Sequence, residues 1–308
     1  MKKTVLYIFL GALLAALLIV FVRTRLAAPQ KTARDGIRVV ASFYPLYFFA
    51  TQIGGADTEI VNITPAGAEP HDYEPTAKEI ARIKQSDLLI LNGGNLEPWG
   101  ERMKKDLANG RTTVVAAGDG LINRNIEEDG QRIRDPHIWL SPPLAKQVSR
   151  RILQGFIGAD PARTALYQAN TASLVQRLDA LDAEYERALA SCAARDIITS
   201  HAAFGYLAYR YHLREVTITG VSPDAEPSIQ KLAQITEFVK QKSVTHIFFE
   251  SLVSPKLSET IARETGALTL VFDPLEGLSA ADAAAGENYF SKMRANLYNL
   301  TIALQCKT

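Results

Sequence analysis

The chain has 308 residues, of which 47% are apolar and 22% are charged, and its 34 basic and 33 acidic side chains leave a formal net charge of +1. This composition excludes a disordered tail, a collagen-like chain and a small disulfide-stapled peptide, and the length suggests about two domains. The balanced charge gives no electrostatic footprint for nucleic acid, and two cysteines are too few for a thiolate zinc ribbon or an iron–sulfur cluster. Any metal site must therefore use histidine and carboxylate side chains.

An apolar run over residues 5–22 lies near the N-terminus, with two lysines before it and two arginines after it. At about 1.5 Å per residue the run is just long enough to cross a bilayer core of about 30 Å, whereas the apolar part of a secretion signal has about 7–15 residues. We expect residues 1–30 to be a signal or membrane anchor, with an uncleaved anchor favoured over cleavage after Ala28. The flanking lysines indicate that the rest of the chain is extracytoplasmic, in the periplasm or on the outer face of the cytoplasmic membrane, tethered by residues 5–22.

Beyond residue 37, short β-branched or apolar segments alternate with amphipathic helical patterns, which is typical of parallel α/β architecture. Helices are expected between the strands, for example over residues 75–85, where Thr76 and Glu79 form a candidate capping box. The sequence thus predicts two α/β lobes with parallel sheets. The expected strands cover residues 37–43, 58–64, 86–93, 112–118, 195–201, 215–220, 245–251 and 267–274.

A single long helix is expected from Asp160 to about Ser191, with Asp160 as its N-cap and Pro161 at its first position. At about 1.5 Å per residue it would span roughly 45 Å and join the two lobes as a rigid strut. The expected domains are an N-terminal metal-binding lobe over 37–157, the linking helix over 158–192 and a C-terminal metal-binding lobe over 193–308. The apolar residues expected on the packed face of the helix are Leu166, Leu174, Leu178, Leu181, Tyr185 and Leu189.

Three of the five histidines lie where the chain enters an expected helix: His71 in the loop after a strand, His137 directly before a helix, and His201 at the end of a strand. In open α/β sheets ligands bind beyond the carboxyl ends of strands, so these positions point to one crevice if the two lobes face each other. His212, in a tyrosine-rich helix end, and His246, at the start of a strand, are expected to be structural.

Carboxylates occupy matching positions in the second half. Asp273 and Glu276 directly follow the last expected strand, and Glu250 ends the strand before it. Three imidazoles and one carboxylate suit zinc in a tetrahedral site, whereas magnesium or calcium would use mostly oxygen ligands. A lone histidine in a loop is more often solvated or a cap, so it is their joint position at strand ends that favours a metal site.

Several segments, in order and over residues 39–304, resemble the zinc-uptake solute-binding proteins of ABC importers, a family of zinc and manganese receptors of the helical-strut type. The segments are PAGAEPHDYEPTAKEIARI, DPHIWLSP, SHAAFGYLAYRYHL, GVSPDAEPSIQKLAQI and FFES followed by DPLEG. The resemblance implies two lobes bridged by a rigid helix, with the metal held between them. His71 and His137 would come from the first lobe, and His201 with a carboxylate from the second.

The resemblance also bears on the metal. Manganese-type relatives carry a glutamate at the position of His201, so this histidine favours Zn²⁺ over Mn²⁺. Glu276 is preferred to Asp273 or water as the fourth ligand, and Asp273 and Glu250 become candidates for accepting a ligand histidine's second ring N–H. Many relatives insert a His-rich loop before the second ligand histidine, but residues 118–136 contain no histidine, and the acidic tract 127–129 is expected to be a solvated turn.

The implied function is that of a monomeric extracytoplasmic binding protein that captures Zn²⁺ and delivers it to an ABC permease. The sequence contains no GxxxxGK[ST] motif, so the cytoplasmic ATPase must be another polypeptide. It also lacks HExxH and GxSxG, which argues against a zinc hydrolase or another enzyme. The alternatives are a manganese- or iron-type receptor of the same family and a surface adhesin, a role that some relatives have.

Cys192 follows the expected long helix and Cys306 lies near the C-terminus. In an oxidising compartment they are expected to form a disulfide that pins the final helix to the second lobe, the alternative being two free thiols.

Overall fold

The structure is a computed structural model that describes residues 36–128 and 130–307. In the first half of the chain, four parallel strands form one sheet in the order β2-β1-β3-β4. Val39 of β1 pairs with Ile60 on one side and with Leu88 on the other. All four expected strands of this half are confirmed. Their bounds are β1 Arg38–Ala41, β2 Glu59–Asn62, β3 Leu88–Leu91 and β4 Thr113–Ala116.

Helices cover both faces of this sheet, which explains why β3 is buried along its whole length. Side chains on one face, such as Leu88, pack in one apolar cluster with α2 (Tyr44–Gly54) and α5 (Pro142–Ala159). Those on the other face, such as Leu89, pack with α3 (Ala77–Gln85) and α4 (Gly100–Leu107). The capping box of Thr76 and Glu79 at the start of α3 is confirmed.

The second half contains two parallel strand pairs, β7 with β8 and β9 with β10. Ile198 and Ile247 pack in one apolar cluster with side chains of α8 (Ile229–Lys242) and α9 (Lys256–Thr265). Ile197 and Phe248 belong to a second cluster that includes residues of α6 (Thr164–Leu189) and α11 (Tyr289–Ala303). The architecture is therefore α/β in both halves, as predicted. The bounds are β7 Asp196–Thr199, α7 Gly205–Arg210, β8 Arg214–Thr217, α8 Ile229–Lys242, β9 His246–Phe249, α9 Lys256–Thr265, β10 Leu268–Val271, α10 Ala280–Ala284 and α11 Tyr289–Ala303.

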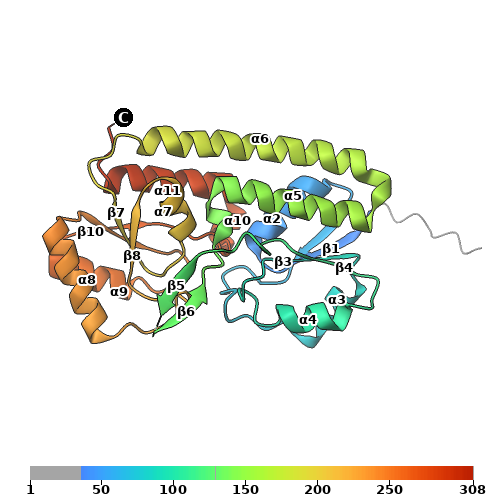
Figure 1. The fold of residues 1–308 in the computed structure, drawn as a ribbon, viewed down its shortest axis with the longest axis horizontal. Coiled ribbons are helices and arrows are strands. Elements are labelled where there is room, and N and C mark those ends of the chain that lie inside the picture. The colour runs from blue at the N-terminus through green and yellow to red at the C-terminus, as the bar shows by residue number, and fades with distance from the viewer. Residues whose placement is uncertain (1–35, 129, 308) are drawn as a thin grey trace, which may run out of the picture. The chain divides into compact units, whose positions relative to one another are not determined.

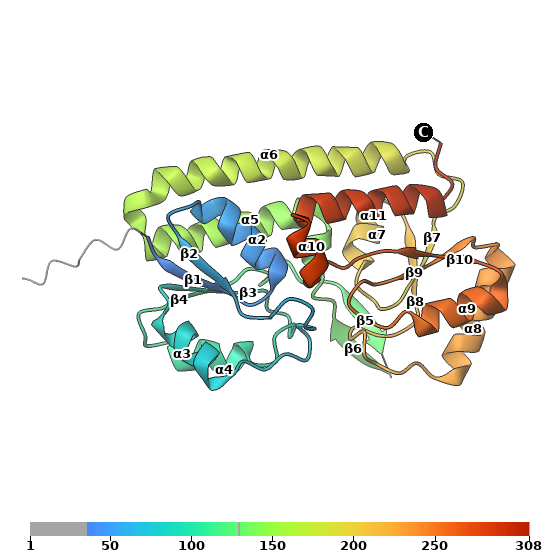
Figure 2. The ribbon, with the colours of Figure 1, turned by 180° about the vertical axis from the view of Figure 1, so that it is seen from behind.

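The long helix α6 (Thr164–Leu189) runs along α5 in the first half and α11 in the second (Figures 1 and 2). It starts later than predicted: Pro161–Arg163 form a 3₁₀ turn, and the carboxylate of Asp160 accepts a hydrogen bond from the hydroxyl of Tyr167 (2.9 Å) instead of capping a backbone N–H. Leu166 is 43% exposed, so its assignment to the packed face was wrong. Tyr167 is buried in its place, because it precedes Leu174 by seven residues, close to two full helical turns.

An antiparallel hairpin, β5 (Asn125–Glu128) and β6 (Gln131–Arg134), occupies the segment in which a solvated turn was expected. That expectation was wrong for positions 127 and 128, which belong to β5, and position 129 lies outside the described residues. The base of the hairpin contacts the second half of the chain, where the hydroxyl of Tyr206 in α7 accepts hydrogen bonds from the backbone N–H groups of Asn123 and Arg124, both at 3.0 Å. The hairpin therefore links the two halves beside the loop that carries His137.

Within the described part of the chain, no helix combines the length and the apolar character needed to cross a bilayer. The predicted anchor, residues 5–22, and the candidate cleavage site at Ala28 lie outside the described residues.

A disulfide joins Cys192, just after α6, to Cys306, just after α11. The same region is also held by backbone hydrogen bonds from Ala194 to Leu304 (3.1 Å) and from Lys307 to Ser191 (3.1 Å). The end of the chain is thus fixed to the C-terminal end of α6.

We predict that the double substitution Cys192→Ser/Cys306→Ser lowers the free energy of unfolding by about 2–4 kcal/mol, because the bridge closes a long loop in the unfolded chain. The two residues are separated by 114 positions. Denaturant unfolding of the wild type and the variant would measure this, with the reduced wild type as control. Equal stability of oxidised and reduced wild type would contradict the prediction.

Candidate metal centre

The side chains of His71, His137, His201 and Glu276 converge, and one potential ligand atom from each lies within 4.8 Å of those of the others. His71 lies between β2 and α3, and His137 follows β6. From the second half, His201 follows β7 and Glu276 follows β10. Each residue comes after a strand, the position expected of ligand-binding residues in α/β sheets.

The distances between these atoms match the edges of a small tetrahedron. Nε2 of His137 lies 3.2 Å from Nε2 of His71, 3.4 Å from Nε2 of His201 and 3.1 Å from Oε1 of Glu276. The same carboxylate oxygen lies 3.4 Å from His71 Nε2 and 3.5 Å from His201 Nε2. Ligands about 2.0–2.1 Å from a tetrahedral zinc ion are about 3.3–3.4 Å from one another. Five of the six distances are therefore those of a four-coordinate site with three nitrogens and one oxygen, and the sixth, between His71 and His201, is at most 4.8 Å.

Two further carboxylates orient the histidine rings from the side remote from the cluster. Nδ1 of His137 lies 2.9 Å from Oδ1 of Asp135, and Nδ1 of His201 lies 2.6 Å from Oε1 of Glu250. A carboxylate that accepts the Nδ1–H of an imidazole fixes the ring and leaves Nε2 free to bind a metal. Glu250 thus lies where it can accept the Nδ1–H of His201.

Sequence reasoning missed two acidic residues, Asp135 and Glu69. Each precedes a cluster histidine by two positions, and each carboxylate accepts a hydrogen bond from the backbone N–H of that histidine, at 3.0 Å for His137 and 3.2 Å for His71. The signal was present in the sequence as a repeated acid-Pro-His tripeptide, Glu69–His71 and Asp135–His137.

Asp273, the other candidate ligand, lies outside the cluster. Its Oδ2 accepts a hydrogen bond from the hydroxyl of Ser251 (2.8 Å) and forms an ion pair with Nζ of Lys292 (2.8 Å). Its Oδ1 accepts a hydrogen bond from the backbone N–H of Leu275 (2.8 Å). Both of its oxygens are therefore engaged within the loop that carries Glu276.

Proton affinities in the cluster follow from burial and from the carboxylates. Burial lowers the pKa of His201, but the charges of Glu250 and Glu276 outweigh burial and hold this pKa well above its ordinary value. Burial likewise lowers the pKa of His137, and the hydrogen bonds to Asp135 and Glu276 raise it above the ordinary value. Burial raises the pKa of Glu276, but the histidines, His201 first, hold it well below its usual range. Without a metal, the site thus holds protonated imidazole beside an ionised carboxylate.

Two groups at the edge of the cluster have pKa shifts opposite to these: the pKa of a histidine is lowered and that of a glutamate is raised. Burial lowers the pKa of His71 and outweighs its interaction with Glu276. Burial, together with the charge of Glu276, raises the pKa of Glu69 to about 9. His71 is therefore neutral and Glu69 protonated near neutral pH, so Glu276 is the ionised carboxylate that lies within 3.5 Å of the Nε2 atoms of all three imidazoles.

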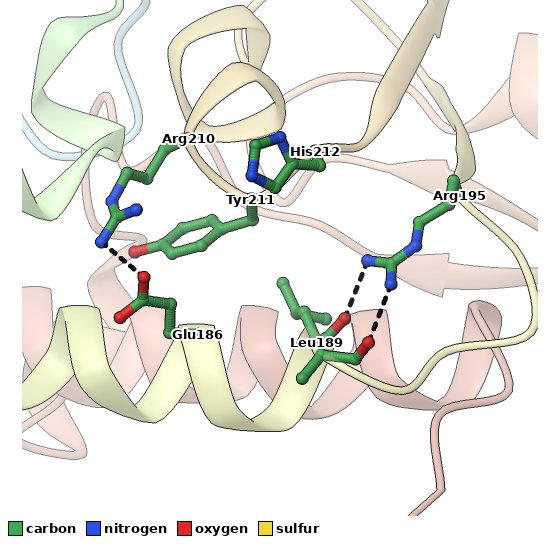
Figure 3. Close-up of a pocket in the computed structure, with 7 residues that line it drawn as sticks. Glu186, Leu189, Arg195, Arg210, Tyr211 and His212 are labelled. Carbon is green, nitrogen blue, oxygen red and sulfur yellow. Dashed lines mark hydrogen bonds and ion pairs between the residues drawn. The ribbon is translucent and has the colours of Figure 1, made fainter.

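The two remaining histidines do not join the cluster. His246 has its Nδ1 2.9 Å from the hydroxyl of Thr245. His212 lines a small pocket at the C-terminal end of α6, shown in Figure 3. The arginines in that pocket are engaged, because Arg195 donates to the carbonyls of Leu189 (2.8 Å) and Ala190 (3.0 Å), and Arg210 pairs with Glu186 (3.0 Å). This pocket closes a helix end and offers no free cation to a ligand.

Comparison with known proteins gives the following relatives. The zinc-binding protein AdcA of Streptococcus pyogenes serotype M1 is 33% identical over 98% of this chain and 62% of its own length, so the chain spans about three fifths of that relative. The high-affinity zinc uptake system protein ZnuA of Bacillus subtilis is 35% identical over 89% of each chain. Among solved structures, the Zn(II)-bound ZnuA-like domain of Streptococcus pneumoniae AdcA matches with a TM-score of 0.77 and 35% identity, covering 87% of this chain and 99% of that domain.

A family model described as the periplasmic component A of the zinc-uptake complex matches residues 39–303. This match includes all four residues of the cluster. The chain therefore belongs to the ZnuA family of zinc-uptake complex components.

Proposed function

We propose that this protein captures Zn²⁺ outside the cytoplasm and delivers it to the permease of an ABC importer, whose ATPase is a separate chain. His71, His137, His201 and Glu276 are the ligands in this proposal. The observation that carries it is the set of distances between their ligand atoms, 3.1–3.5 Å for the pairs that include His137 or Glu276. Membership of the zinc-uptake family supports it independently.

The donor set favours zinc over manganese. Three imidazole nitrogens and one carboxylate in a tetrahedral arrangement suit Zn²⁺, whereas Mn²⁺ prefers more oxygen ligands in octahedral geometry. In this chain the other carboxylate of the loop that carries Glu276, Asp273, is paired with Lys292 (2.8 Å) and so contributes no further oxygen.

Capture would need both halves of the chain at once. We propose that residues 37–157 supply His71 and His137, that residues 193–308 supply His201 and Glu276, and that the segment 158–192 keeps the two lobes facing each other. Because the four side chains are at most 7% exposed, an ion held there would be shielded from water. We further propose that the protein acts as a monomer, and that residues 5–22 tether it to the membrane, which rests on the sequence alone.

The ligand assignment predicts how much zinc each variant retains. Purified wild type should hold stoichiometric zinc in elemental analysis, while His71→Ala and Glu276→Ala should hold clearly less after dialysis against a chelator, because each loses one of four donors. His246→Ala is the matched control, since His246 lies outside the cluster and should leave the zinc content unchanged. Stoichiometric zinc in His71→Ala would remove His71 from the site.

Zinc affinity should fall as the pH is lowered. The metal-free site binds more protons than the zinc-bound site, because His201 and His137 have raised pKa values and must lose their protons to bind the metal. Low pH therefore favours the metal-free state, and the loss should begin above the ordinary histidine pKa of about 6.5. Chelator competition between about pH 8 and about pH 5.5 would measure this, and a constant affinity over that range would contradict ligation by imidazole.

Glu250→Gln should lower zinc affinity by about 10–100-fold with the fold intact, because the substitution removes the charge that orients His201 and raises its basicity. Glu97→Gln is the matched control. Glu97 is also a buried carboxylate, but it accepts hydrogen bonds from Ser42 (2.5 Å) and the backbone of Asn92 (2.7 Å), with no imidazole among its hydrogen-bond partners. If both variants lost zinc affinity equally, the loss in Glu250→Gln would come from a less stable fold and would contradict a specific role of Glu250 at His201.

A further inference from the structure

The short turn over residues 273–276, which presents Glu276 to the three histidines, has an unusual backbone. Leu275 adopts a positive φ of 57°. For a bulky side chain this left-handed conformation is unfavourable, and it persists only where the surroundings hold it in place. The position of the Glu276 carboxylate therefore depends on the contacts that fix this turn.

Helix α11 fixes the first residue of the turn through Asn296, which is 1% exposed. The side-chain oxygen of Asn296 accepts a hydrogen bond from the backbone N–H of Asp273 (2.8 Å), and its amide group donates to the backbone carbonyl of Asp273 (2.6 Å). One buried side chain thus satisfies both backbone polar groups of Asp273 and leaves its carboxylate free for other partners.

The carboxylate of Asp273 then holds the rest of the turn. Oδ1 accepts from the N–H of Leu275 (2.8 Å), which is the residue with positive φ. Oδ2 pairs with Nζ of Lys292, one turn before Asn296 on α11, at 2.8 Å. On the other side, the indole N–H of Trp139 donates to the carbonyl of Pro274 (2.7 Å). Polar contacts thus fix the three residues before Glu276.

We infer that Asn296 and Lys292 are positioning residues for the fourth donor: from α11 they hold the 273–276 turn so that Oε1 of Glu276 completes the tetrahedron. The inference rests on the proposed function. Neither residue belongs to the cluster of four side chains. They act through Asp273, which they fix at its backbone and at its carboxylate, and thereby set how well the site suits a tetrahedral ion.

A double-mutant cycle tests this inference. Asn296→Ala should lower zinc affinity by about 10-fold in the wild-type background, in the range known for residues that orient metal ligands. In a Glu276→Ala background the same substitution should change zinc affinity by less than about 2-fold, because there is no fourth donor left to position. Chelator competition with zinc measures all four proteins.

Asn299→Ala is the matched control on the same helix. The amide of Asn299 donates to the carbonyl of Val271, the last residue of β10 (2.8 Å), so its loss also removes a hydrogen bond from α11 to the backbone, but not one to residues 273–276. Cobalt(II) serves as a second readout: its visible absorption bands should change in Asn296→Ala and stay as in the wild type in Asn299→Ala. Lys292→Met should also change the bands. Lys292→Arg, which keeps the charge, should leave the bands as in the wild type.

The zinc affinities and the cobalt bands together test the positioning role. An equal loss of zinc affinity in the two backgrounds, or unchanged cobalt bands in both Asn296→Ala and Lys292→Met, would overturn the positioning role while leaving zinc capture intact. A wild type that fails to bind zinc would instead overturn the proposed function itself.

Discussion

The structure depends on bringing three imidazole nitrogens and one carboxylate oxygen from distant parts of the chain into a buried cluster, in which the pairs that include His137 or Glu276 lie 3.1–3.5 Å apart. Such crowding of buried polar groups is costly unless their charges are complementary. Here Glu276 is ionised and the carboxylates beside His137 and His201 favour protonated rings. Protons can thus stabilise the arrangement in the metal-free protein, and a divalent cation that displaces them meets donors that are already in place.

Hydrogen bonds and helix packing elsewhere in the fold hold the two halves of the chain together around that cluster. Trp139, two residues after His137, donates to the carbonyl of Pro274, two residues before Glu276, and its own carbonyl accepts from the hydroxyl of Tyr289 in α11 (2.6 Å). Helix α6 is bound to α11 by the hydroxyl of Tyr185, which donates to the carbonyl of Met293 (2.6 Å). Because α6 also packs along α5 (Figure 2), a helix from each half is held against the same long helix.

Much of this could be predicted from the sequence, for identifiable reasons. The eight parallel strands were found because each is a short β-branched or apolar run bounded by turn residues, and the three histidines because each lies where the chain enters an expected helix. The hairpin β5–β6 was missed because its strands, such as Asn125–Glu128, are mostly polar and carry little hydrophobic pattern. Leu166 was misplaced because hydrophobicity alone does not decide between adjacent positions, whereas the angle around the helix selects Tyr167.

The resemblance favoured Glu276 over Asp273 as the fourth ligand, and the structure adds the physical reason. Both are acidic, both follow β10, and both are buried, at 3% and 2% exposure. What separates them is the basic group that each meets: Lys292 pairs with Asp273, while Oε1 of Glu276 lies within 3.5 Å of three imidazole nitrogens. A buried carboxylate that already has an ammonium partner gains little by binding a metal, and one surrounded by basic nitrogens is ready to share an ion with them. The ion pair with Lys292 of α11, which only the folded chain brings beside Asp273, thus distinguishes the two carboxylates.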